Sequence, residues 1–175
     1  MFSLIFVFIY AISGASYADT EYEKSGPEVA ISLFKKELSS LGEWPERPTV
    51  VVCKNTPVST EAVESAVAWW RSLGYDFWMI IPDSIHYGGV FGKPNGKILI
   101  RLVNGQTFNA DNLATTYIYH NEETKEILWA EIFLREEPKE RVLEHEIGHA
   151  LGWLHYSKKN HIMHPIWTHS GWDDD

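Results

Sequence analysis

The sequence predicts an α/β (α+β) domain built around a mixed, mostly parallel sheet, and two patterns support this prediction. An apolar run, an amphipathic segment with helical spacing and a second apolar run follow one another over residues 49–81. This order is typical of a β–α–β unit with parallel strands and a right-handed crossover. Two further apolar segments flank a polar turn at residues 121–125 and indicate an antiparallel hairpin. With 175 residues and no repeat or linker, the chain has the length of one domain.

The first half of the chain contains four expected elements. Apolar residues at helical intervals over residues 27–41, which start with a proline and end before a glycine, predict a helix. The run TVVVC at residues 49–53 is continuous and rich in β-branched residues, which indicates a buried strand. Residues 59–73 begin with two possible capping side chains and repeat apolar positions every 3.6 residues. We therefore expect a second helix there, followed by a strand at residues 77–81.

The second half begins with a glycine-rich segment at residues 86–96 and continues with three expected strands. These strands cover residues 97–103, 113–119 and 127–134, and the last two form the predicted hairpin. Pro138 suits the first turn of a final helix, whose apolar residues lie on one stripe. The opposite face of that helix carries the residues of chemical interest.

Composition excludes several classes of protein. Fifteen Lys and Arg residues against 24 Asp and Glu residues give a net charge of −9, so no basic surface is available for a nucleic acid. The single cysteine, Cys53, excludes an internal disulfide and a cysteine-rich zinc site. Because it lies inside an apolar strand, we expect Cys53 to be a buried core residue. Any metal site must therefore use histidines and acids.

The N-terminus carries the pattern of a signal peptide. Residues 4–12 form an uncharged apolar run, which is too short to span a bilayer because that requires about 20 residues. Small residues at positions 16 and 18 predict cleavage before Asp19, so residues 1–18 are interpreted as a leader and the mature chain as secreted or periplasmic, with no membrane contact. No Lys or Arg precedes the apolar run, and a retained membrane tether or a buried N-terminal strand is the alternative.

The final helix carries a histidine pattern with metal-ligand spacing. His145 and His149 are four residues apart, so on a helix their rings lie one above the other and can bind one ion. Gly152 can end the helix with a positive φ and let His155 approach the same ion. Three neutral imidazoles leave a fourth zinc position open for a water whose pKa falls to about 7. Glu146 is the candidate base for that water.

Each of these residues also has an ordinary interpretation. A single histidine on a helix is more often a surface or hydrogen-bonded residue, and a single glutamate is more often a solvated charge. At the frequencies of this chain, however, the five fixed positions coincide by chance on the order of 10⁻⁴ of the time. A zinc site that binds the metal without turnover is the alternative that remains.

The residues of this histidine motif resemble a known family. Residues 145–155 match the HExxHxxGxxH signature of the metzincin metalloproteases, and Met163 lies where that family has its Met-turn. Residues 160–165, NHIMHP, are most similar to the matrixin branch. The resemblance implies a single-domain zincin fold with one catalytic Zn²⁺ on the three histidines and Glu146 as general base. It also implies that Met163 forms a hydrophobic floor beneath the metal, whereas the residues alone would suggest a core side chain.

The resemblance extends more weakly upstream, and it implies that residues 111–119 form an antiparallel, substrate-binding edge strand. The substrate contacts implied in this way are Leu113, Ala114, Thr115 and Pro165. The catalytic domain would cover residues 46–175, after an N-terminal helical extension at residues 19–45 that has no matrixin counterpart. Only 12 residues follow Met163, so the family's C-terminal helix is nearly absent. No upstream His/Asp cluster has the family's structural-zinc pattern, which leaves structural zinc and calcium open.

Together these features favour a secreted zinc-dependent endopeptidase that hydrolyses peptide or protein substrates. In this hypothesis zinc polarises the scissile carbonyl, and Glu146 moves the proton from water to the leaving amine. The alternative is a metzincin-fold zinc-binding protein with a structural or interaction role and no turnover. The shortened C-terminus and the absence of a cysteine-switch propeptide motif favour this alternative.

Overall fold

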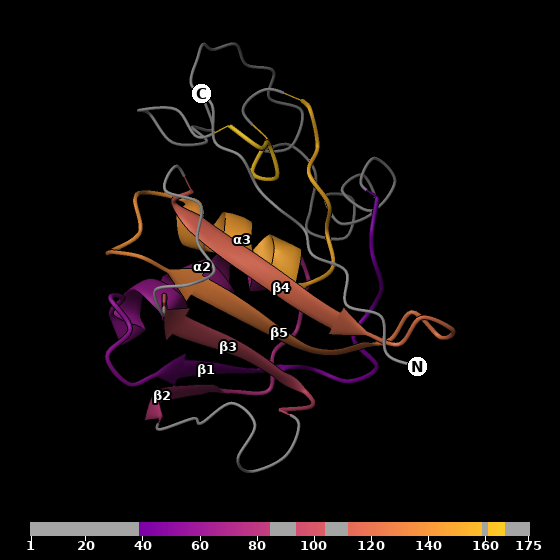
Figure 1. The fold of residues 1–175 in the computed structure, drawn as a ribbon, viewed down its shortest axis with the longest axis horizontal. Helices are drawn as coiled ribbons and strands as arrows, with labels where there is room; N and C mark the ends of the chain where they lie inside the picture. The colour runs from indigo at the N-terminus through magenta and orange to yellow at the C-terminus, as the bar shows by residue number, and fades with distance from the viewer. Residues whose placement is uncertain (1–38, 85–93, 104–111, 159–160, 167–175) are drawn as a thin grey trace.

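The computed structural model describes residues 39–84, 94–103, 112–158 and 161–166. These residues form a small α/β domain in which a five-stranded sheet carries two helices on one face (Figure 1). The predicted leader at residues 1–18 lies outside the described residues. So do most of the helix expected at 27–41 and most of the glycine-rich segment at 86–96.

The sheet is mixed and mostly parallel, as the sequence predicts. Its strand order is β2-β1-β3-β5-β4, with β1 parallel to β2 and β3, and β3 parallel to β5. The pairing of β4 with β5 is antiparallel and places β4 at one edge of the sheet. The strands are β1 (Thr49–Cys53), β2 (Ile80–Ser84), β3 (Lys97–Leu102), β4 (Ala114–His120) and β5 (Ile127–Leu134).

Both predicted helices of the described region are present. Helix α2 (Thr60–Ser72) is capped by Ser59, whose Oγ accepts a hydrogen bond from the Ala62 N–H at 3.1 Å. Helix α3 (Val142–Ala150) begins four residues after Pro138, because Arg141 adopts a left-handed backbone with φ of 62° and the residues before it form turns.

Two further predicted boundaries also differ from the structure. The strand expected at residues 77–81 runs instead from Ile80 to Ser84, because the Trp78 N–H donates to the Pro48 carbonyl before the regular ladder with β1 begins. Residues 39–41, the described end of the helix expected at 27–41, are extended. Their backbone partners are the residues that follow α3: Leu41 N–H donates to the Gly152 carbonyl, and Ser39 accepts from the Leu154 N–H.

The core lies between the helices and the sheet face that they cover. Trp70 of α2 is fully buried there, and its indole N–H donates to the Glu144 carbonyl of α3 at 2.8 Å. A Cβ on Gly148 would come within 2.4 Å of Met163 and 2.6 Å of Trp70, so glycine lets both side chains pack against α3. The other buried members of this core include Val50, Val63, Val67, Ile98, Ile100, Ile132, Leu134 and Ile147.

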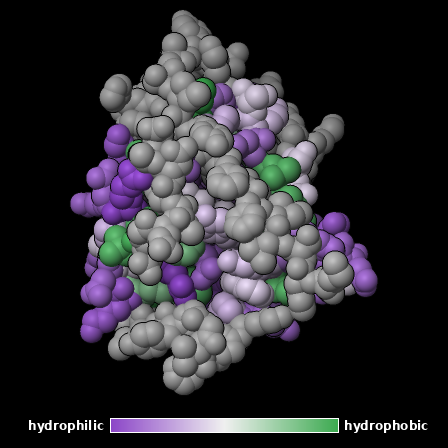
Figure 2. Space-filling view, in the orientation of Figure 1, coloured by the Kyte–Doolittle hydropathy of each residue, from purple (hydrophilic) through white to green (hydrophobic). Residues whose placement is uncertain are grey.

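The opposite face of the sheet contains a smaller buried cluster, formed by Val51, Cys53 and Leu99. Cys53 is a free, buried thiol, as predicted. In the space-filling view, the hydrophobic side chains of the described residues occupy small areas among hydrophilic ones (Figure 2). Among the described residues, no helix has the length and hydrophobicity needed to span a bilayer.

Candidate metal centre

Helix α3 brings the first two histidines of the motif together. His145 and His149 are each 2% exposed, and their ring centroids are 4.6 Å apart. The Nδ1 atom of His145 lies 2.5 Å from the Ile162 carbonyl oxygen, and that of His149 lies 2.6 Å from the Trp153 carbonyl oxygen. Both acceptors lie outside the helix, in the segments that follow it.

These two hydrogen bonds determine the tautomers of both rings. A carbonyl oxygen can only accept, so each Nδ1 must carry the proton, and each neutral ring then has a bare Nε2. The two Nε2 atoms face each other at 3.0 Å. Neither can donate to the other, so the two lone pairs repel unless a cation lies between them. This donor set fits a metal ion.

The turn that follows α3 brings the third histidine, His155, close to the other two. Gly152, with φ of +104°, ends the helix in a Schellman motif: its N–H donates to the His149 carbonyl, and the Trp153 N–H donates to the Gly148 carbonyl. The chain then reverses and places the His155 ring 4.8 Å from that of His149. Among the described residues, the buried Nε2 of His155 meets no hydrogen-bond partner. An unsatisfied buried nitrogen aimed at a histidine pair is a natural metal ligand.

The three histidines can hold one metal ion. Their candidate ligand atoms all lie within 4.8 Å of one another. Two nitrogens bound to one tetrahedral zinc at 2.0–2.1 Å would be about 3.4 Å apart. The site therefore needs movements of about an ångström or less to close around an ion.

The histidines of the metal-free site are neutral at physiological pH. Burial lowers the pKa of His145 to about 3 and holds that of His149 well below 6.5. Burial and, to a lesser extent, the nearby His164 lower the pKa of His155 to about 4. Because a metal needs unprotonated imidazoles, these low pKa values keep the ligands ready to bind over a wide pH range.

Glu146 lies beside this site in a dry environment. Its side chain is 2% exposed, and burial raises its pKa to about 7. Its Oε2 accepts a hydrogen bond of 2.5 Å from the hydroxyl of Thr116, which partly offsets this increase. Since Thr116 occupies Oε2, the other carboxylate oxygen is left to take up a proton. A carboxyl group with a pKa near 7 suits proton transfer at neutral pH.

Thr116 is a site residue that the sequence analysis missed. It is 1% exposed, and it belongs to β4, thirty residues before its partner Glu146. The alternation of side chains along a strand could have indicated it, because residues 114, 116, 118 and 120 share the face that α3 covers. Nothing in the sequence gives the register that places position 116 opposite Glu146.

The remaining predicted residues lie as follows. Met163 is fully buried against Gly148, and its carbonyl accepts from the Tyr156 N–H, so the segment after His155 folds back under α3. Pro165 is half-buried two residues later. Leu113 precedes β4, and the buried side chains of Ala114 and Thr115 begin it, so a peptide at this edge would meet their backbone.

Searches of protein-family models, curated proteins and solved structures found no match for this chain. The chemistry proposed below therefore rests on the residues and their geometry.

The metal-free protein should lose stability as the pH falls from 6.5 to 4.5. The unfolded chain protonates its three ligand histidines near pH 6.5, whereas burial keeps them neutral in the folded chain well below that pH, so each opposes folding by up to about 1.4 kcal/mol per pH unit. Glu146 acts in the opposite direction, because its pKa is raised from 4.5 to about 7 and the folded state keeps its proton. Unfolding should therefore take up about two protons, measurable by urea titration across this range.

The variant Glu146→Gln is the control for this prediction. It removes the carboxyl group that releases a proton on unfolding, so the proton uptake on unfolding should rise from about two to about three. An unfolding free energy that is constant from pH 6.5 to 4.5 would contradict the neutral, buried state of the histidines.

Proposed function

We propose that this protein is a secreted or periplasmic zinc endopeptidase of the metzincin type, most similar to the matrixins. The observation that carries the proposal is a three-imidazole site with the buried Glu146 next to it in α3. Export by a leader at residues 1–18 is part of the proposal.

Zinc is the metal that this donor set favours. Three histidine nitrogens with an open fourth position are the ligands of a catalytic zinc, whereas calcium and magnesium prefer oxygen ligands. When bound, zinc supplies a Lewis acid that polarises a carbonyl and acidifies water to a pKa of about 7. The residues that would hold it are His145, His149 and His155.

The other residues of the site have distinct tasks in peptide hydrolysis. Glu146 takes a proton from the attacking water and delivers it to the leaving amine. Thr116 holds one oxygen of that carboxylate at 2.5 Å and so orients the other. The carbonyls of Ile162 and Trp153 hold the rings of His145 and His149, and such outer contacts fix the tautomer and direction of metal-binding imidazoles.

The edge strand β4 offers a place for the substrate. One side of β4 pairs with β5, and the other side is an edge of the sheet, where an extended peptide can add main-chain hydrogen bonds. Thr116 belongs to this strand and also contacts Glu146, so a peptide on β4 would lie beside the general base. This arrangement supports an endopeptidase, which must hold chain on both sides of the scissile bond.

A digest of a fluorescent peptide library tests the proposal. We expect cleavage that is lost with a chelator and returns with a stoichiometric amount of zinc. Intact peptides together with one tightly bound zinc per chain would instead identify a zinc-binding protein without turnover. Full cleavage in the presence of the chelator would contradict the metal-dependent mechanism.

Replacing Thr116 by valine should lower kcat about tenfold and leave the zinc content unchanged, because the general base loses its orienting contact and not its proton-accepting group. The buried carboxyl also loses its partner, which should destabilise the fold by about 1–3 kcal/mol. Thr116→Ser keeps the hydroxyl and should restore most of kcat. Steady-state kinetics on the zinc-loaded variants measure the loss of kcat in Thr116→Val and its recovery in Thr116→Ser.

The matched control for this experiment is Thr56→Val. It removes a partly buried hydroxyl that donates to the Cys53 carbonyl, away from the site. An equal loss of kcat in Thr56→Val and Thr116→Val, or no recovery in Thr116→Ser, would show that Thr116 affects only stability.

A further inference from the structure

A cavity lies between the segment at residues 40–48 and the C-terminal ends of α2 and α3. Its volume is about 380 Å³, within the range of small-ligand sites. It is lined by Ser40, Gly42, Glu43, Trp44, Pro45, Glu46, Arg47, Pro48, Tyr75, Asp76, Leu151 and Trp153.

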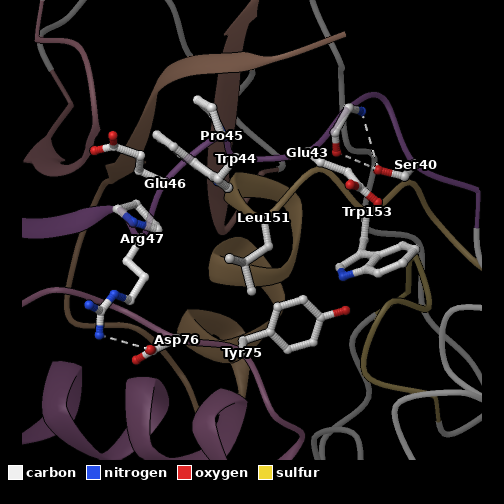
Figure 3. A pocket seen from close by; sticks show the side chains of 12 residues that line it. Ser40, Glu43, Trp44, Pro45, Glu46, Arg47, Tyr75, Asp76, Leu151 and Trp153 are labelled. Carbon is white, nitrogen blue, oxygen red and sulfur yellow. Dashed lines mark hydrogen bonds and ion pairs between the residues drawn. The ribbon is translucent and has the colours of Figure 1, made fainter.

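Three of the residues that line this cavity are aromatic. Figure 3 shows Trp44, Tyr75 and Trp153 on three sides of Leu151, whose side chain points into the space between them. The rings of Tyr75 and Trp153 are nearly perpendicular, with an interplanar angle of 88° and centroids 6.3 Å apart. In this edge-to-face arrangement the edge of one ring points toward the face of the other.

Backbone contacts hold these walls in place. The indole N–H of Trp44 donates to the Ala150 carbonyl at 2.9 Å, which fixes the ring against the end of α3. The backbone of Glu43 is bound on both sides to the β4–β5 hairpin, through the Lys125 carbonyl and the Ile127 N–H. The cavity is therefore formed before a ligand arrives, which lowers the entropic cost of binding.

The charge at the rim is negative. Among the described residues that line the cavity, Arg47 is the one cation. It pairs with Asp76 at 3.1 Å and stacks over Trp78 outside the cavity, so these two charges cancel. Glu43 and Glu46 then leave two negative charges, and Figure 3 shows the Glu43 carboxylate beside Trp153. Burial raises the pKa of the Tyr75 hydroxyl, and the charge of Glu43 adds to this effect, so that charge reaches into the cavity.

We propose that this cavity binds an alkylammonium group, such as the side chain of a lysine in a partner peptide, between Trp44, Tyr75 and Trp153 and next to Glu43. Aromatic faces attract cations, and the alkyl stem of such a ligand can pack on Leu151. The carboxylate adds a charge contact at the rim. An anion would be repelled by the negative rim. A neutral apolar group would pack on the rings but would gain neither the cation–π attraction nor the charge contact with Glu43.

Ligand-observed NMR on the zinc-loaded full chain tests this proposal. The probes are Nα-acetyl-lysine N-methylamide, its neutral norleucine counterpart and choline. We expect the lysine compound to bind in the millimolar range and the norleucine compound at least tenfold more weakly. A stronger response to choline than to the lysine compound would assign a small quaternary ammonium compound, not a peptide, as the source of the ammonium group. Equal binding of the lysine and norleucine compounds would overturn the proposal.

Three variants locate the binding. Glu43→Gln should weaken binding of the lysine compound several-fold without changing the zinc content or the unfolding temperature, because its side chain is exposed at the rim. Tyr75→Phe keeps the ring and should retain binding. The control Glu122→Gln makes the same charge change on the exposed hairpin turn and should have no effect. If Glu43→Gln binds the lysine compound as tightly as the unmodified chain, the cavity is not the site.

Discussion

Replacing Glu146 by glutamine should lower peptide turnover by about 10²–10⁴-fold, the usual contribution of a positioned acid–base group. The amide has the size of the carboxyl and can still accept from the Thr116 hydroxyl, which donates to Oε2 at 2.5 Å in the unmodified chain. It cannot take a proton from water. Removing a carboxyl group that is 2% exposed also avoids a charge-burial cost, so the fold should remain intact.

The measurement is kcat/KM for one cleaved peptide, together with zinc content by elemental analysis. We expect one zinc per chain in both the unmodified protein and Glu146→Gln. Loss of zinc in the variant would make Glu146 a ligand, and unchanged cleavage would make another residue the base.

Replacing His149 by alanine should abolish stoichiometric zinc binding. The remaining two imidazoles do not close a stable site, since structural and catalytic zinc sites use at least three protein ligands. The variant also loses the hydrogen bond from Nδ1 to the Trp153 carbonyl, which holds the chain just beyond Gly152. Elemental analysis after dialysis measures the effect, and full zinc content in the variant would place the metal elsewhere.

Two further variants distinguish the loss of a metal ligand from a simple folding defect. His155→Gln changes a half-buried ring and leaves no cavity in α3, and it should also lose zinc. His161→Ala removes a histidine outside the triad, whose Nδ1 accepts from the Met163 N–H, and it should keep one zinc per chain. Loss of zinc in His161→Ala would contradict a site made of the three motif histidines alone.

The local pattern of the sequence determined a large part of this structure. Five of the expected elements lie within one residue of their observed bounds, because buried strands and amphipathic helices have distinct hydrophobic periods. The spacing of His145 and His149 was sufficient to place both rings on one face of a helix, since i and i+4 are neighbours there. Gly152 at the helix end has the positive φ that its position suggests.

Contacts between distant parts of the chain decided the rest. The extended path of residues 39–41 depends on free backbone groups after α3, which local helical spacing cannot reveal. The tautomers of His145 and His149 depend on carbonyls that the chain supplies only after it folds back. Thr116 reaches Glu146 because the sheet register brings residue 116 under α3, and register is a property of strand pairing.

The cavity lined by Trp44, Tyr75 and Trp153 shows most clearly which features depend on the tertiary structure and not on local sequence. Glu43, Tyr75 and Trp153 are each ordinary residues in their own segments, and no short motif joins them. They meet because the extended segment before β1 crosses the ends of both helices. The sequence by itself determined which residues can bind a metal and that His145 and His149 lie on one helix. The tertiary structure alone decided which side chains surround them, because those contacts join residues that are distant in the chain, as Thr116 and Glu146 are.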